Sequence, residues 1–182
     1  MNPLKLYCLN KEFKHQLTNS RARLFRVAFS WSHQSDVADD LVQETMAKAI
    51  KYARQLRDKN AMESWLFGIM ANCWRDYLRK QKPMDDIDDD LLSHNDTPEQ
   101  HYERQDIVDL IQNTMSELPI GQRQVLSLVE LEGFSYSEVA EILSIPVGTV
   151  MSRLSRARKQ MAEKLLTQAQ AKDHIKTLRR VV

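Results

Sequence analysis

Four polar residues follow one face of a helical segment expected between residues 62 and 80. They are Asn72, Arg75, Asp76 and Arg79. Their i, i+3, i+4, i+7 spacing would align the side chains on one face of a helix. Arginine and asparagine donate hydrogen bonds to phosphates and to base edges, so this stripe could bind nucleic acid. An ordinary solvated helix face has the same pattern, and the spacing alone does not separate the two interpretations.

A second polar face lies on a helix expected from residue 147 to about 166. Its apolar positions are Val150, Leu154, Ala157, Met161 and Leu165, and its outward positions are Met151, Ser152, Ser155, Arg156 and Lys159. On such a face Arg156 can make a bidentate contact to O6 and N7 of guanine in a major groove. Arg153, Arg158 and the helix N-terminus at Thr149 suit phosphates.

Two tryptophans, Trp65 and Trp74, lie on the same expected helix as the first polar stripe. Aromatic rings interleaved with cations can stack on unpaired bases of a single strand. Core packing explains both tryptophans without any ligand, and it is the favoured interpretation because it is the commoner role of this side chain.

The sequence contains none of the common motifs for catalysis or for metal binding. It has no H-E-x-x-H, G-x-S-x-G, Walker or dinucleotide-binding motif, and no two of its five histidines are spaced i, i+4. Cys8 and Cys73 form no Cys-x-x-Cys pair, and we expect both to be reduced thiols. We therefore predict no catalytic residue, metal, cofactor or small-molecule substrate, and rank an enzyme last among the functions considered.

Helices must position these residues, because the sequence lacks the turn residues that many short strands would need. Only four glycines and five prolines occur in 182 residues. One amphipathic helix is expected from residue 36 to 56, and the next, from 62 to 80, should bury Trp65, Ile69, Cys73 and Tyr77. The fold class predicted is all-α, with two small helical domains at residues 1–82 and 98–182.

The second domain has the pattern of a helix-turn-helix. A helix should start at the capping box Ser135 to Glu138, after Phe134 and with Val139 as the second half of a hydrophobic staple. Residues 144–146 then make a three-residue turn into the helix at 147. Another capping box, at residues 97–100, predicts the first helix of this domain. A plain amphipathic hairpin with a basic exterior is the competing interpretation.

The net charge of +1 is the sum of three blocks of opposite sign. Residues 1–82 carry +7, residues 83–118 carry −10 and residues 119–182 carry +4. Two basic blocks on either side of an acidic one predict binding to a polyanion. Pro83 cannot continue the preceding helix, and the aspartates after it favour an extended chain, so we expect a flexible acidic linker at residues 83–97.

The spacing of the aspartates in this linker partly matches a calcium-binding loop. Asp86, Asp88 and Asp90 match the first three ligand positions of an EF-hand loop. Leu91 and Thr97, however, stand where that loop needs its glycine and its glutamate. A solvated linker is therefore favoured over a metal site. Competition of the aspartates with nucleic acid for the basic faces is a further interpretation.

Three motifs, in this order, resemble bacterial RNA polymerase sigma factors of the extracytoplasmic-function (ECF) group. They are residues 39–45 (DDLVQET), residues 64–79 (SWLFGIMANCWRDYLR) and residues 146–158 (PVGTVMSRLSRAR). The resemblance spans residues 13–166. It implies an all-helical protein whose N-terminal region 2 and C-terminal region 4 are joined by a variable linker. Two departures occur: Ser144 replaces a glycine common in the turn, and Met151 stands where a cation is frequent.

The resemblance also implies roles for individual residues. Those implied to dock on core RNA polymerase are Asp40, Gln43 and Glu44. Those implied to hold the melted minus-ten element, within or beside the loop of residues 58–64, are Asn60, Ala61, Trp65, Asn72, Arg75 and Arg79. Those implied to read the minus-thirty-five element are Thr149, Met151, Ser152, Arg153, Ser155, Arg156 and Arg158. The family further implies an anti-sigma factor as a regulatory partner.

The function predicted is that of a transcription initiation factor that brings core RNA polymerase to promoter DNA. A stand-alone helix-turn-helix repressor or activator is the alternative, and it would bind a palindromic operator as a dimer. A protein that only sequesters a partner is a second alternative. Because the sequence has neither a signal peptide nor an apolar run of transmembrane length, we expect a cytoplasmic protein, held at the membrane only through an anti-sigma factor.

Overall fold

The computed structural model describes residues 11–56, 58–81 and 103–179, and these residues form helices without a strand. The first part contains α2 (Lys11–Ser32), α3 (Ser35–Tyr52), the 3₁₀ turns η1 (Ala53–Gln55) and η2 (Lys59–Ala61), and α4 (Met62–Gln81). The second contains α5 (Glu103–Ser116), α6 (Ile120–Glu130), α7 (Tyr136–Leu143) and α8 (Val147–Arg179). The predicted all-α class is confirmed for this part of the chain. The predicted linker at 83–97, its aspartates and the capping box at 97–100 lie outside the described residues.

Helices α2, α3 and α4 pack around an apolar core. The predicted buried face of α4 is only partly right: Cys73 is buried, whereas Trp65, Ile69 and Tyr77 are half-buried. Leu66, Phe67, Met70, Ala71 and Trp74 are buried as well. A strict four-residue step drifts around a helix of 3.6 residues per turn, so a set at that spacing cannot stay on one side over four turns.

The ends of two helices differ from the sequence prediction. The expected helix 36–56 ends at Tyr52 and continues as the 3₁₀ turn η1, which leaves Leu56 in an extended conformation. Helix α8 passes the expected end near Leu166 and continues to Arg179. The sequence after Gly148 contains neither glycine nor proline, so no residue there interrupts the helix.

The capping box at the start of α7 is confirmed. The backbone N–H of Glu138 donates to the Ser135 hydroxyl at 3.3 Å, and the backbone N–H of Ser135 donates to the Glu138 carboxylate at 2.8 Å. The Ser135 hydroxyl also donates to the Glu138 carboxylate at 2.6 Å, and this bond, together with the one from the backbone N–H of Ser135, lowers the pKa of Glu138. Phe134 and Val139 are both buried, as a hydrophobic staple requires.

Replacing Ser135 with alanine should therefore lower the free energy of unfolding by about 1 kcal/mol. The cap of α7 would be lost while the apolar contacts of Phe134 and Val139 stay in place. Urea unfolding followed by circular dichroism measures this value. An unchanged midpoint in Ser135→Ala would show that the cap does not stabilise the helix-turn-helix. Ser155→Ala, which removes an exposed serine hydroxyl from α8, is the control.

The turn between α7 and α8 explains why glycine is common at the position of Ser144 in the family that the motifs resemble, because a left-handed backbone favours glycine. Ser144 adopts a left-handed conformation with φ of 56°, and it ends α7. The N–H of Ile145 bonds to the carbonyl of Ala140 at 3.0 Å, which closes the end of the helix. Pro146 follows, and α8 starts at Val147. The two helices and their short turn form the predicted helix-turn-helix.

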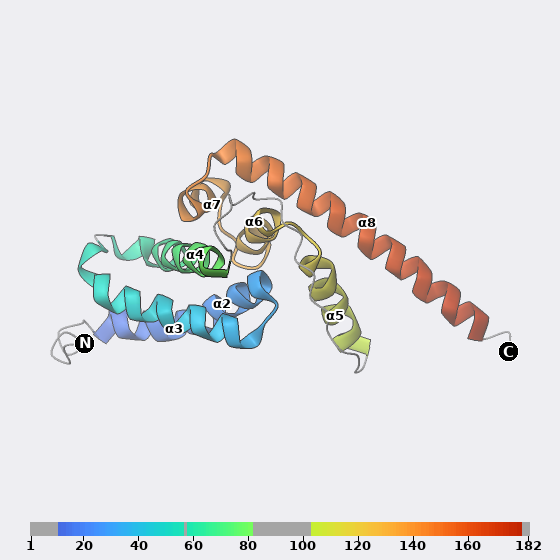
Figure 1. The fold of residues 1–182 in the computed structure, drawn as a ribbon, viewed down its shortest axis with the longest axis horizontal. Coiled ribbons are helices and arrows are strands. Elements are labelled where there is room, and N and C mark those ends of the chain that lie inside the picture. Colours follow the sequence, from blue (N-terminus) through green and yellow to red (C-terminus); the bar gives the residue numbers. More distant parts are fainter. Residues whose placement is uncertain (1–10, 57, 82–102, 180–182) are drawn as a thin grey trace.

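The N-terminal and C-terminal helices lie against each other rather than apart. Helix α7 packs on α4, and α6 and α5 pack on α2, so that one apolar core runs through both parts. Figure 1 shows α7 and α6 resting on the layer of α2, α3 and α4, with α8 extending past α5. We call this arrangement, with α6 and α7 in contact with α2 and α4, the closed arrangement.

Candidate nucleic-acid interface

The polar stripe predicted on α4 is present on the surface. Asn72, Arg75 and Arg79 are exposed, and Asp76 is half-buried among them. A guanidinium nitrogen of Arg75 donates to the side-chain oxygen of Asn72, and Arg79 pairs with the Asp76 carboxylate. These partners lie on the same helix, so the stripe keeps its cations in one line and available to a ligand.

The loop before α4 is short and held by its own hydrogen bonds. The backbone N–H of Asn60 donates to Oδ1 of Asp58 at 2.9 Å, and the Ser64 hydroxyl donates to the Ala61 carbonyl at 3.1 Å. The side chain of Asn60 is exposed and Ala61 is half-buried. The loop therefore presents Asn60 and Ala61 next to the first turn of α4.

Trp65 and Trp74 have different surroundings. Trp74 is a core residue that stacks on Tyr77, with ring centroids 5.3 Å apart. Trp65 is half-buried beside Phe13 and lines an open groove. Trp74 therefore packs in the core, whereas part of the Trp65 ring remains exposed beside the polar stripe.

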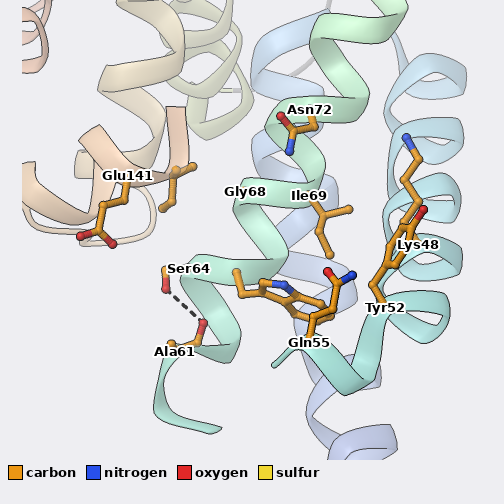
Figure 2. Close-up of a pocket in the computed structure, with 11 residues that line it drawn as sticks. Lys48, Tyr52, Gln55, Ala61, Ser64, Gly68, Ile69, Asn72 and Glu141 are labelled. Atoms are coloured by element: carbon orange, nitrogen blue, oxygen red, sulfur yellow. Dashed lines mark hydrogen bonds between the residues drawn. The ribbon is translucent and has the colours of Figure 1, made fainter. Parts of the chain in front are cut away.

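The groove beside Trp65 has a volume of about 640 Å³ and brings residues of α3, the loop and α4 together. Its walls include Ala61, Ser64, Trp65 and Asn72 from the predicted minus-ten set and its neighbours, with Lys48 and Tyr52 from α3 and Gln55 from η1. Glu141 and Ile142 of α7 border it on the other side. Figure 2 shows Glu141 of α7 on one side of α4 and Lys48 of α3 on the other.

Sequence reasoning missed the contribution of α3 to this groove. Lys48 appeared only as a helix-surface partner of Glu44, and the structure confirms that ion pair at 2.8 Å. The hydrogen bond that the Lys48 ammonium donates to the Glu44 carboxylate raises the pKa of Lys48, so the ammonium stays charged. No sequence pattern indicated a functional role for Tyr52 or Gln55, because their place in the groove depends on how α3 packs against α4.

A second cleft, of about 620 Å³, contains the rest of the stripe. Asn72, Arg75 and Arg79 line it from α4, and Ser144, Ile145 and Arg153 line it from the helix-turn-helix. Three guanidinium groups from two helices thus border one cleft. Such a set can bind phosphate groups by charge and by hydrogen bonding.

The outward face of α8 has the composition predicted for a recognition helix. Met151, Ser152, Ser155 and Arg156 are exposed, while Val150, Leu154 and Ala157 are buried. Met151 is 54% exposed, an unusual position for a large apolar side chain, and one that suits contact with the methyl group of thymine. Ser152 donates to the Thr149 carbonyl at 3.1 Å, and Thr149 is half-buried.

Two arginines of α8 have partners within the protein. Arg158 donates to the Glu130 carboxylate of α6 at 2.6 and 2.9 Å, which raises its pKa. Arg153 is half-buried, and its guanidinium lies where a Cβ on Gly121 would come within 2.9 Å. In the closed arrangement Arg153 thus lies against the start of α6, and Arg156 is the exposed arginine that the face presents beside Met151 and Ser152.

The three residues implied to dock on polymerase lie elsewhere. Asp40, Gln43 and Glu44 are exposed on the outer face of α3, spaced i, i+3, i+4. They line neither of the two clefts described above. The protein therefore separates an acidic surface on α3 from the cationic surfaces on α4 and α8.

The described residues contain no group of three histidine, cysteine or acidic side chains arranged to hold a metal ion. Within the same residues, no helix is both long and apolar enough to cross a membrane. The chemistry that the described surfaces do offer is hydrogen bonding, charge and aromatic stacking.

The fold and these surfaces define a helical DNA-binding protein with a helix-turn-helix in its C-terminal half, and comparisons with known proteins specify it further. Residues 18–83 match the family model for sigma-70 region 2, and residues 109–161 match the model for sigma-70 region 4. The ECF RNA polymerase sigma-E factor of Haemophilus influenzae is 35% identical over 138 residues, covering 69% of this chain and 73% of that protein. The RNA polymerase sigma factor SigV of Bacillus subtilis is 32% identical over 146 residues. This match covers 80% of this chain and 86% of that protein.

Solved structures agree with these sequence matches. The sigma factor RpoE of Bartonella quintana, solved in complex with the anti-sigma factor NepR, gives a TM-score of 0.69 at 27% identity. The match covers 86% of this chain and 98% of that one. CnrH, solved in complex with the cytosolic domain of CnrY, shares the fold with a TM-score of 0.64, covering 91% and 94% of the two chains.

The chain belongs to the ECF group of bacterial RNA polymerase sigma factors. It is a transcription initiation factor that directs RNA polymerase to promoters. The predicted family and function are therefore confirmed, and nothing in the comparisons supports the stand-alone repressor or activator.

Proposed function

We propose that the two halves of the chain divide promoter recognition between them. Region 2, within residues 1–82, binds core polymerase through α3 and traps the melted minus-ten element on α4. Region 4, within residues 98–182, reads the minus-thirty-five element through α8, and residues 83–97 connect them. The observation that carries this assignment is the presence of two separate cationic faces, one beside an aromatic groove and one on a helix-turn-helix.

The groove on α4 fits a single strand better than a duplex. Trp65 offers a ring on which an unpaired base can stack, and stacking of this kind contributes about 1–3 kcal/mol per base. Asn72, Arg75 and Arg79 would follow the strand, and Asn60 and Ala61 would contact a base flipped out of the stack. Each of these contacts requires strands that have already separated, so the groove stabilises the melted promoter.

The exposed face of α8 fits a major groove. Arg156 would contact guanine, while Met151, Ser152 and Ser155 lie beside it and would contact neighbouring bases. Thr149, Arg158 and Arg153 would bind phosphates on either side of the groove. Because Arg158 already pairs with Glu130, and Arg153 lies against α6, these two would exchange an internal partner for a phosphate.

The acidic face of α3 should be the docking site for core polymerase. Replacing both Asp40 and Glu44 with alanine should weaken binding to core polymerase about ten-fold, or about 1.4 kcal/mol, because two exposed carboxylates of the contact are removed. DNA contacts should be unaffected. Binding of fluorescently labelled chain to core polymerase measures the change. Glu130→Ala with Glu163→Ala is the matched control, since it removes two exposed carboxylates from the C-terminal half, and an equal loss in the control would contradict the assignment.

The chain itself would perform no catalysis, and its partners would be core polymerase, promoter DNA and an anti-sigma factor. The sigma factor structures that it resembles were solved as complexes with the anti-sigma factor NepR and with CnrY. A comparable protein would regulate this chain. A cytoplasmic location follows from these partners, with retention at the membrane only through such a regulator.

Reconstituted transcription tests the proposal. Purified chain is mixed with bacterial core polymerase and promoter fragments, and run-off transcripts and permanganate-reactive thymines are measured. We expect transcripts and reactive thymines near the minus-ten element only when both the chain and the core enzyme are present. Tight binding of the free chain to a palindromic operator, with no transcript in the mixture, would favour a repressor instead.

A further inference from the structure

An acidic residue lies inside the cationic stripe of α4. Asp76 is between Arg75 and Arg79 in the sequence, and it lines the same cleft as both of them. Its side chain is 41% exposed, so its carboxylate is accessible to a ligand. A carboxylate repels phosphate groups. Asp76 therefore opposes the DNA binding that the proposed function assigns to this face.

Asp76 has cationic partners on two helices. Arg79, one turn farther along α4, pairs with its carboxylate. From α3, Nζ of Lys48 lies 3.6 Å from Oδ2 of Asp76. The same ammonium lies closer to Glu44, at 2.8 Å from Oε1. Lys48 is thus shared between two carboxylates, and it offsets the charge of Asp76 only in part.

The pair of Lys48 and Asp76 lies along the path proposed for the melted strand. Lys48 lines the groove that contains Trp65, and Asp76 lines the cleft that contains the arginines. Asn72 borders both the groove and the cleft, and Asp76 follows it by about one turn of α4. Figure 2 shows Lys48 on the α3 side of α4. A strand that stacks on Trp65 and follows the stripe would pass both members of the pair.

The pair contributes little to holding α3 on α4. Its side chains are 30% and 41% exposed, and exposed ion pairs add little to stability. A separation of 3.6 Å is also too long for a hydrogen bond. The pair has a larger effect on the charge that the face presents. Arg75, Arg79 and Asp76 carry a formal charge of +1 together, and Lys48 brings it to +2.

We propose that Asp76 limits the affinity of the minus-ten face for single-stranded DNA, and that Lys48 of α3 sets how strongly it does so. This inference rests on the proposed assignment of the minus-ten element to α4. Contacts to phosphates carry no sequence information, so a more cationic face would hold any single strand more tightly. The acid lowers this general affinity and leaves discrimination to the residues proposed to contact bases, such as Asn60 and Trp65.

The two members of the pair should have opposite effects when they are replaced. Asp76→Asn keeps the shape of the side chain and raises the formal charge of the face to +3, whereas Lys48→Met keeps the aliphatic stem and lowers it to +1. At low salt we expect Asp76→Asn to tighten strand binding about three- to ten-fold, and Lys48→Met to weaken it by a similar factor. The double variant returns to +2 and should bind within about two-fold of the wild type.

Strand binding by the holoenzyme measures these effects. Holoenzyme is assembled from core polymerase and each variant, purified, and titrated with a labelled single strand that spans the minus-ten element of a promoter with a mapped start site. Fluorescence anisotropy at several salt concentrations gives the dissociation constants. Each cation released to a phosphate should steepen the dependence of log affinity on log salt by about 0.7, so the slope should be steepest for Asp76→Asn and shallowest for Lys48→Met. A strand of scrambled sequence should show the same fold-changes.

A similar ion pair in the C-terminal half supplies the control. Lys164 of α8 pairs with Glu117, in the turn after α5, and their side chains are 30% and 50% exposed. Lys164→Met and Glu117→Gln thus remove the same kinds of charge from a pair of similar exposure. Neither should change the affinity for the single strand. Far-UV circular dichroism verifies that every variant keeps its helices.

The proposal is overturned if Asp76→Asn leaves strand affinity unchanged or weakens it, or if the double variant binds no better than Lys48→Met. The last two results together would show that the pair only joins α3 to α4. A gain confined to the matched strand would also overturn it, because Asp76 would then act on a base. Arg75→Ala tests the proposed function separately. If this variant binds the strand normally, α4 does not hold it, whereas weaker binding without a gain in Asp76→Asn contradicts the inference alone.

Discussion

Replacing Arg123 with methionine should lower the free energy of unfolding by about 3 kcal/mol or more. The guanidinium satisfies the carbonyls of Trp31, Ser116 and Leu118, and each buried acceptor left without a donor costs about 1–3 kcal/mol. Methionine can fill the volume of the arginine stem, but it cannot donate to any of the three. Urea unfolding of the full chain, followed by tryptophan fluorescence and circular dichroism, gives the value.

The physical reason lies in what surrounds this side chain. Trp31 and Ser116 lie at the ends of α2 and α5, where the backbone carbonyls carry partial negative charge. Burial lowers the pKa of Arg123 to about 10, which still leaves the group charged at neutral pH. The carbonyls at the ends of α2 and α5 thus pair with Arg123 in place of a carboxylate. Arg123→Lys should retain part of the stability, and a loss below about 1 kcal/mol in Arg123→Met would contradict this explanation.

Replacing Arg156 with alanine should reduce promoter-dependent transcription about five- to 150-fold. A bidentate contact between arginine and guanine contributes about 1–3 kcal/mol of discrimination, and the exposed position of Arg156 on α8 suits that contact. Binding to core polymerase should be unchanged, because Arg156 lies on α8, away from the acidic face of α3. Run-off transcription from promoters of this family, alongside a core-binding assay, measures both effects.

The control for this variant is Arg54→Ala, which removes an exposed arginine from the turn after α3. It should change transcription much less. If Arg156→Ala leaves transcription intact at every such promoter, Arg156 does not read the major groove. A loss that is shared equally by all sequences would instead indicate a phosphate contact.

The sequence predicted the helix-turn-helix well, because its signals are local. The capping box at Ser135, the staple of Phe134 and Val139, and the apolar spacing of Val150, Leu154 and Ala157 all depend on residues within two turns. The family motifs implied roles for the surface residues, which no periodicity could suggest. Helix ends were less predictable, since α8 contains no residue that would stop it.

The contact between the halves could not be predicted from the sequence. Arg123 lies between two glutamines, and Glu132 lies in a turn next to Gly133, so both resemble solvated surface residues. Their burial depends on partners on α2 that are about 100 positions away in the chain. For the same reason Lys48 and Tyr52 were not expected in the groove, which exists only because α3, α4 and α7 meet.

Photo-crosslinking in the holoenzyme tests the division of promoter recognition most directly. A photoreactive amino acid replaces either Asn72 on α4 or Ser152 on α8, both exposed, and the complex is assembled on a promoter with a mapped start site. We predict that position 72 crosslinks to a melted strand near the minus-ten element, and position 152 to duplex near the minus-thirty-five element, each only with core polymerase present. Crosslinks from both positions to one element, or equal crosslinks without the core enzyme, would contradict the assignment of the two faces.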